Sequence, residues 1–217
     1  MPTAPRPPAR LAARFAAGLF AASLLLLATA PVAARDPDAD IIVVGAGIAG
    51  IAAALEAEGH GARVLVLDMN SVPGGHAVKA GGFALVDTPL QRQKGYADSA
   101  EVAARDRLAW GEDADAGWVR RYVAASGPEV GDWLAGLGVR WAFILDTPEH
   151  SVPRFHFAAG SALNAVVPML RVAMTRPGIE WRLGTQVLEL TRRRGRVTGV
   201  VARNLRSGEE RRYTAGA

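Results

Sequence analysis

The amino-acid sequence predicts an α/β fold in which a parallel sheet is combined with additional helices and a β-meander. Three observations support this prediction. A short apolar run, a glycine-rich turn and a helix-like segment follow one another over residues 40–61. Helical spacing of apolar residues then dominates residues 99–137 and 160–175. Short alternating runs separated by glycine turns make up residues 179–213, and this order is typical of an α/β domain with an added β-rich segment.

The first unit contains a glycine fingerprint that indicates dinucleotide binding. The apolar residues 41–44 are followed by Gly-x-Gly-x-x-Gly and then by an alanine-rich helix pattern. In such a unit the first glycine permits the turn out of the strand, the second lets the backbone approach a pyrophosphate, and the third lets the helix pack closely on the strand. The helix N-terminus then presents free N–H groups to the phosphates. The predicted binding residues of this turn are Gly45, Ala46, Gly47, Ala49 and Gly50.

The unit continues as a Rossmann-like FAD/NAD(P)-binding domain requires. A helix is expected over 50–61 and a second buried strand over 63–68, which ends in Asp68. Asp68 follows Gly50 by 18 positions, close to the roughly 20 expected for a ribose-binding acid, and its carboxylate would repel a 2′-phosphate. The alternative is an ordinary βαβ unit whose glycines only make turns.

The first 34 residues predict a secretory signal peptide. Three arginines, an apolar run over 15–30 and the small residues 32–34 occur in the order that a signal peptidase recognises, with cleavage after Ala34. The mature domain is then residues 35–217, and the protein is expected to be periplasmic or secreted. A membrane anchor is the alternative if the leader is not cleaved, although the apolar run is short for a span of about 20 residues.

Composition excludes several classes of function. The chain has no cysteine, which removes disulfide frameworks, cysteine nucleophiles and iron–sulfur clusters. The formal charge of +4 falls to about +1 without the three leader arginines, so we expect no nucleic-acid partner. The four histidines show no metal-ligand spacing, and no Gly-x-Ser-x-Gly sequence is present, so neither a metal site nor a serine triad is expected.

Two glycine pairs follow Asp68 closely. They are Gly74-Gly75, which continues into His76 and Ala77, and Gly81-Gly82. Such a segment is incompatible with a regular helix and is typical of a loop whose backbone approaches a flat ligand. A flexible surface loop is the alternative.

The remaining elements follow from local patterns. A helix is expected to begin with Asp98 or Ser99 as its cap, and the apolar residues of 114–137, among them Trp118 and Tyr122, are expected to face the core. An extended segment follows near residue 141. A further helix is expected over 160–175. The last strands are expected over 179–183, 186–191, 196–202 and 210–213.

Together these residues resemble one family, the FAD-dependent oxidoreductases of the fumarate reductase and succinate dehydrogenase flavoprotein type. Its members include flavocytochrome c fumarate reductases, urocanate reductases and ketosteroid dehydrogenases. The resemblance rests on the glycine fingerprint with Asp68, on the two-glycine-pair loop, and on the segments 88–101, 133–139 and 184–187. It implies FAD as the cofactor, held at the fingerprint, the loop and the backbone of Val187, which in relatives contacts the adenine.

The resemblance also implies an activity. A hydride would pass between flavin N5 and an activated C–C bond of a small-molecule substrate, with an electron-donor protein as a possible partner. Ala77 replaces a Ser or Thr that hydrogen-bonds the cofactor in relatives, and His76 replaces Asn or Thr. Catalytic residues in relatives follow the position of Ala217, together with a substrate-capping domain, so this chain is expected to be an N-terminal fragment, and no catalytic residue is assigned. A nicotinamide-dependent enzyme and a non-catalytic nucleotide-binding remnant are the alternatives.

Overall fold

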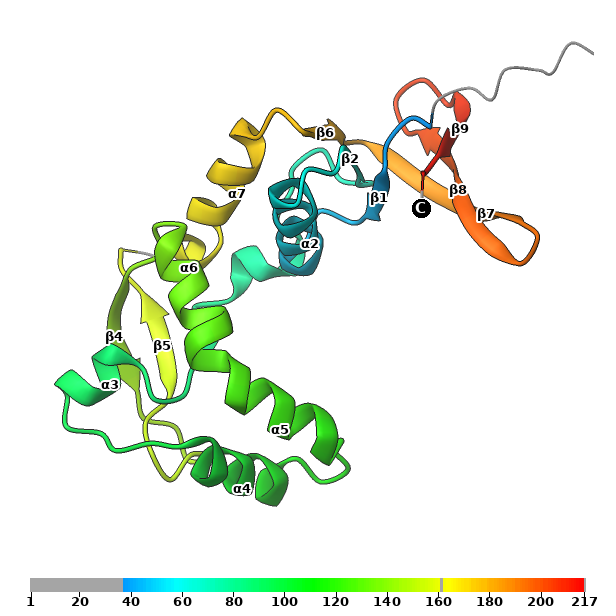
Figure 1. The fold of residues 1–217 in the computed structure, drawn as a ribbon. Helices are drawn as coiled ribbons and strands as arrows, with labels where there is room; N and C mark the ends of the chain where they lie inside the picture. Colours follow the sequence, from blue (N-terminus) through cyan, green and yellow to red (C-terminus); the bar gives the residue numbers. More distant parts are fainter. Residues whose placement is uncertain (1–36, 161, 217) are drawn as a thin grey trace, which may run out of the picture. The chain divides into compact units, whose positions relative to one another are not determined.

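The structure is a computed structural model that describes residues 37–160 and 162–216 (Figure 1). The predicted signal peptide, residues 1–34, lies outside the described residues. In the part of the chain that is described, helices are too short or too polar to cross a membrane.

The predicted parallel sheet is present. It consists of β1 (Ile41–Val44), β2 (Val64–Leu67) and β6 (Ile179–Arg182), in the order β1-β2-β6 with both pairings parallel. Helix α2 (Ile48–Gly59) connects β1 to β2 and completes the βαβ unit that the glycine fingerprint predicted. All four residues of β2 are buried, as expected for the central strand of a parallel sheet.

One hydrophobic core forms between the sheet and the helices. Side chains of α2 pack against β2, β6, α6 (Asp132–Gly136) and α7 (Val167–Thr175). Its buried members are Ala46, Ile51, Ala54, Leu55, Val64, Val66, Leu134, Val139, Met169, Ala173 and Ile179. Removal of this apolar surface from water is the main favourable term that holds α2 on the sheet.

A second sheet was not predicted, apart from the extended segment near residue 141. It consists of β3 (Gly82–Ala84), β5 (Phe155–Ala158) and β4 (Trp141–Leu145), in the order β3-β5-β4 with antiparallel pairings. The strands are three to five residues long, and β3 pairs with a strand more than seventy positions later in the chain, as in the pair Phe83 and His156. Local sequence patterns do not reveal pairings of this kind.

The predicted helical region is present but interrupted. It contains α3 (Pro89–Gln93), α4 (Ala100–Trp110), α5 (Ala116–Ala125) and α6, with a π-helical segment η2 (Ser126–Gly131) between α5 and α6. Pro128 lies within η2, and a proline inside a helix removes one backbone hydrogen bond and disturbs the regular spacing. Ser99 caps α4, as predicted.

Two predictions in the helical regions were wrong. Trp118 and Tyr122 of α5 were expected to face the core, but they are 75% and 39% exposed. The helix expected over 160–175 is split into a 3₁₀ turn, η3 (Ala162–Ala165), and α7. Pro168 explains the split, because proline is tolerated in the first turn of a helix and not in its interior.

The predicted meander is confirmed. Strands β7 (Thr185–Arg193), β8 (Arg196–Asn204) and β9 (Glu210–Thr214) form an antiparallel sheet, coloured orange to red in Figure 1. The β7–β8 turn places Arg194 and Gly195 at φ values of 51° and 80°, which is typical of a two-residue hairpin turn. The arginines at its tip are exposed, as expected for a solvated turn.

Strand β1 forms one edge of the parallel sheet within the described residues. Its side chains Ile41 and Val44 are 37% and 54% exposed. Ala215 lies beside the start of this edge in a parallel bridge with Ala39, whose carbonyl accepts the Gly216 N–H at 3.0 Å. Both faces of a parallel sheet are normally covered, so these two side chains are unusually exposed.

The fold predicts that Gly50 tolerates no side chain. A Cβ atom at Gly50 would lie 1.9 Å from the carbonyl oxygen of Gly45 and 3.3 Å from Val43. We expect Gly50→Ala to lower the free energy of unfolding by about 1–3 kcal/mol, because α2 has to move away from the sheet. Chemical denaturation measures this value.

Gly59→Ala in the same helix is the matched control, because a Cβ there meets nothing within 4 Å among the described atoms. It should keep or raise stability, by up to about 1 kcal/mol, since alanine is the better helix former. Equal destabilisation by the two substitutions would contradict the packing account.

Candidate functional site

The glycine turn between β1 and α2 has the geometry of an anion cradle. Gly45 has a φ of 97°, which a residue with a side chain rarely adopts. Gly47 is the N-cap of α2 and provides no side-chain cap, and the first turn of the helix contains no acidic residue. The N–H groups and the positive end of this twelve-residue helix therefore remain available to a phosphate.

The first glycine pair of the following loop lies directly against this turn. The Gly74 N–H donates to the Ala46 carbonyl at 2.6 Å, and Gly47 and Gly74 form a parallel bridge. A Cβ at Gly75 would lie 3.1 Å from the Cα of Gly47, and Gly74 and Gly75 both have positive φ. The two glycine-rich segments thus form one backbone surface without side chains between them.

Asp68 joins this surface to the end of β2. One carboxylate oxygen accepts the Ala46 N–H at 2.5 Å, and the other accepts the Asn70 N–H at 2.7 Å. The side chain is 8% exposed. An ionised carboxylate has about four acceptor positions, so Asp68 retains capacity for two hydroxyl donors while it orders the glycine turn.

Val187 is brought to the same end of the sheet. The Thr185 N–H, two positions earlier in β7, donates to the Asp68 carbonyl at 2.8 Å. β7 is an edge strand of the meander, so half of its backbone groups face away from β8. Val187 also lies beside a β-bulge, because the register with β8 shifts between Val187 and Glu189.

The second glycine pair packs closely against β5. A Cβ at Gly82 would lie 1.7 Å from the His156 carbonyl oxygen, and a Cβ at Gly81 would lie 2.4 Å from the Phe157 ring. Gly81 and Gly82 are therefore required by close packing on β5, rather than only by the approach of a ligand.

His76 and Ala77 lie between the two glycine pairs, in the 3₁₀ helix η1 (Gly75–Lys79). His76 is exposed, whereas Ala77 packs on the cluster Ala158, Ala165 and Val166. The middle of the predicted loop is thus helical, and its ends contact other elements.

These residues fit an adenine dinucleotide. Among the described atoms nothing lies within 4 Å of a Cβ built on Gly47, although the backbone on both sides of this residue is tightly packed. Open space at the second fingerprint glycine, a free helix N-terminus and a carboxylate at the end of β2 are the three features that pyrophosphate and ribose require.

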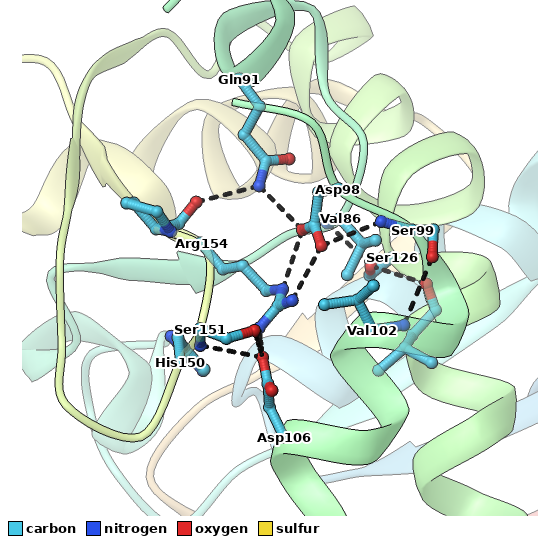
Figure 2. Close-up of polar contacts among 12 residues, drawn as sticks. Val86, Gln91, Asp98, Ser99, Val102, Asp106, Ser126, His150, Ser151 and Arg154 are labelled. Atoms are coloured by element: carbon cyan, nitrogen blue, oxygen red, sulfur yellow. Dashed lines mark hydrogen bonds and ion pairs between the residues drawn. The ribbon is translucent and has the colours of Figure 1, made fainter. Parts of the chain in front are cut away.

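A buried ionic network was missed by the sequence analysis (Figure 2). Arg154, 1% exposed, donates through Nε and Nη2 to both oxygens of Asp98 at 2.8 Å and through Nη1 to Asp106 at 2.5 Å. Asp106 also accepts both the backbone N–H and the hydroxyl of Ser151. Burial by itself raises the pKa of Asp106, but the hydrogen bonds from Arg154 and Ser151 outweigh burial and hold that pKa below its ordinary value.

The sequence contains only a weak indication of this ionic network. Asp98 was interpreted only as a possible cap, and Arg154 was not singled out. Its partners lie 56 and 48 positions earlier in the chain. An arginine directly before the apolar strand Phe155–Ala158 was the one available indication, because a buried arginine requires carboxylate partners.

His156 extends the network towards α3. Its Nδ1 lies 2.7 Å from the Arg154 carbonyl, which can only accept, so Nδ1 carries the proton. Nε2 therefore accepts from the Thr88 hydroxyl at 2.6 Å. Burial, the largest effect, lowers the pKa of His156 below its ordinary value, and burial together with Arg107 and Arg154 does the same for His150.

Comparison with known proteins identifies the family. Residues 40–217 match the FAD binding domain family, and the chain belongs to it. The match confirms the predicted cofactor, FAD, and the predicted class, the FAD-dependent oxidoreductases. It also confirms that the glycine fingerprint lies within a nucleotide-binding domain rather than an unrelated βαβ unit.

The chain is similar to a KsdD-like steroid dehydrogenase of Mycobacterium tuberculosis, with 34% identity over 197 residues, 80% of this chain and 34% of the relative. It is also similar to the NADH:fumarate oxidoreductase of Klebsiella pneumoniae, with 34% identity over 164 residues, 74% of this chain and 18% of the relative. The chain thus spans about a third or less of the length of these relatives.

Two solved structures share the fold. The 3-ketosteroid-Δ4-(5α)-dehydrogenase of Rhodococcus jostii superposes with a TM-score of 0.75 and 29% identity, covering 86% of this chain and 46% of that one. The open conformation of a flavocytochrome c3 fumarate reductase gives a TM-score of 0.74 and 30% identity, covering 84% of this chain and 33% of that one. The antiparallel sheets and the helical region therefore belong to the family fold.

The two buried histidines predict that stability falls on acidification. An unfolded histidine titrates near pH 6.5, whereas the pKa values of His150 and His156 in the folded protein are lower. Below about pH 6.5 the unfolded chain therefore binds more protons than the folded one, and the free energy of unfolding decreases.

We expect the free energy of unfolding to fall between pH 7 and pH 5, and His156→Gln to fall less steeply over this range. Denaturant titrations at several pH values measure both slopes. A wild-type free energy that stays constant over this range, or an unchanged slope in the variant, would contradict the assignment of neutral His156.

Proposed function

We propose that this chain is the FAD-binding part of an oxidoreductase that transfers a hydride to or from an activated C–C bond of a small molecule. The observation that carries the proposal is the joint surface of the two glycine segments, closed at one end by Asp68. The names of the similar proteins, steroid dehydrogenases and fumarate reductases, support substrates of this chemical kind.

Each part of the cradle has a proposed role towards FAD. The N–H groups at the start of α2, beside Gly45, Ala46, Gly47, Ala49 and Gly50, bind the pyrophosphate. Asp68 accepts the ribose hydroxyls, and the backbone of Val187 contacts the adenine. Gly74, Gly75, His76 and Ala77, followed by Gly81 and Gly82, form the wall towards the flavin. These six residues are the proposed FAD-binding residues of the loop.

The chemistry is divided between cofactor and protein. When FAD is bound, its flavin supplies a hydride acceptor or donor at N5. We propose that the described residues contribute binding and orientation. We propose that the groups that contact substrate and deliver the proton belong to a region equivalent to the part of the relatives that this chain does not cover.

The site predicts that Gly47→Val removes flavin without unfolding the protein. The valine side chain enters the space required by the pyrophosphate, whereas the surrounding protein leaves that space free. We expect the flavin absorbance per protein of the purified full-length variant to fall close to zero, with a wild-type far-UV circular dichroism spectrum.

Gly59→Val, at the opposite end of α2, is the matched control and should keep its flavin, because a Cβ there also meets nothing among the described atoms. A Gly47→Val protein that retains the wild-type flavin ratio would show that the dinucleotide binds elsewhere.

We also propose that the protein is exported and that the mature chain begins at Arg35. The basic leader, the apolar run and the small residues before position 35 support this proposal. Intact-mass measurement of protein from the periplasm or medium should give the mass of the chain from Arg35. Ala34→Arg should block processing, and an intact Met1 terminus on cytoplasmic wild-type protein would contradict export.

Finally, we propose that FAD is bound noncovalently. His76 is exposed on η1, but the sequence around it lacks the Ser-His-Thr context associated with covalent attachment in succinate dehydrogenases. Acid precipitation of the full-length protein should release the flavin into the supernatant, and His76→Ala should still bind flavin. Colour retained in the acid pellet of the wild type and lost from the pellet of His76→Ala would overturn this proposal.

A further inference from the structure

We propose that the buried ion triad of Asp98, Arg154 and Asp106 positions the loop of residues 74–82, which we call the cofactor loop. The triad holds β5 in place, β5 holds Gly81 and Gly82, and this glycine pair sets the flavin end of the loop. The inference rests on the proposed binding of FAD, but its mechanical part concerns only the described residues and is testable without cofactor.

Two carboxylates hold the guanidinium of Arg154, as Figure 2 shows. Asp98 comes from the segment before α4, and Asp106 comes from α4 itself. Gln91 of α3 donates through Nε2 both to Asp98 and to the carbonyl of Pro153, each at 2.9 Å. The side chains of Arg154, Asp98 and Asp106 are only 2%, 0% and 11% exposed, so water screens these bonds little.

The backbone of Arg154 transmits this position to β5 and β3. Its carbonyl accepts the Leu85 N–H at 3.0 Å, directly after β3, and also the Nδ1–H of His156. The β3–β5 register then continues through the pairs of Ala84 with Phe155 and of Gly82 with Phe157. A displacement of Arg154 therefore displaces the start of β5 and the end of β3 together.

Strand β5 and the second glycine pair are closely packed. The Ala158 N–H donates to the Gly81 carbonyl at 3.2 Å. Gly82 lies so close to the His156 carbonyl, and Gly81 so close to the Phe157 ring, that neither position has room for a methyl group. The loop backbone must follow β5, because close-packed groups transmit a shift rather than absorb it.

The cofactor loop consequently has two independent anchors. Its first end, Gly74, bonds to Ala46 of the nucleotide turn, and its second end bonds to β5. The first anchor belongs to the pyrophosphate end of the cradle. The second anchor depends on a triad that includes no residue of the proposed FAD contacts, so Arg154 acts through the loop and is a positioning residue.

The test uses the full-length protein with Arg154→Lys, which keeps the positive charge but loses the bidentate contact with Asp98. Arg203→Lys is the matched control, because Arg203 also donates through two nitrogens to a carboxylate, Glu210, but on the exposed meander. Asp106→Asn is the milder second variant, since it leaves the contact with Asp98 intact.

Two readouts separate positioning from simple stability. In cofactor-free protein, amide hydrogen exchange of residues 82–84 should be at least about tenfold faster in Arg154→Lys, with exchange in β7–β9 unchanged. With FAD, the dissociation constant should rise about tenfold, and the visible circular dichroism of the bound flavin should change even at saturating FAD. Arg203→Lys should match the wild type in both readouts.

Unchanged exchange at residues 82–84 in folded Arg154→Lys overturns the proposal, whether or not FAD binds. A variant that only unfolds at lower temperature, with wild-type FAD affinity and flavin spectrum, overturns it too. If Arg154→Lys does not fold, Asp106→Asn decides by the same criteria with smaller expected changes. A wild-type protein that fails to bind FAD contradicts the proposed function instead, and the exchange comparison still tests the link between triad and loop.

Discussion

The arrangement of this domain depends on the hydrogen bonds of Asp68. Its carboxylate binds the N–H groups of Ala46 and Asn70, and its carbonyl accepts the N–H of Thr185. One residue therefore joins the turn after β1, the loop after β2 and the first residue of the meander. An unpaired N–H at the buried positions Ala46 and Thr185 would cost about 1–3 kcal/mol, so the acid at the end of β2 has a structural role as well as a proposed role towards ribose.

Around this junction, glycines occupy positions where two backbone segments approach each other closely. Gly50 lies against Gly45, Gly75 lies against Gly47, and Gly82 lies against His156. Among the described atoms, a Cβ at Gly45 or at Gly47 would meet nothing within 4 Å. Packing thus accounts for Gly50, Gly75 and Gly82, and a positive φ accounts for Gly45. The open space at Gly47 leaves room for the proposed ligand.

The sequence predicted those features that are encoded locally. The Ser99 cap and the hairpin at Arg194-Gly195 each depend on residues within a few positions of one another. The βαβ unit depends on consecutive elements whose patterns can each be recognised in the sequence. The β3–β5 pairing and the partners of Arg154 depend on residues about fifty or more positions apart, and no periodicity reports such contacts. Trp118 has the spacing of a core residue but is exposed, because spacing identifies a helix face and not what covers it. Gly81 and Gly82 were predicted as positions that a ligand approaches; their packing on β5 also depends on distant residues and could not be predicted from the sequence.

The central claim is that the joint glycine surface and Asp68 hold FAD. The most direct test is a crystal structure of the full-length protein grown with FAD. The account predicts the pyrophosphate at the N-terminus of α2, beside Gly47, and both ribose hydroxyls within hydrogen-bond distance of the Asp68 carboxylate. A pyrophosphate away from α2, or a ribose held by another residue while Asp68 contacts only Ala46 and Asn70, would contradict it.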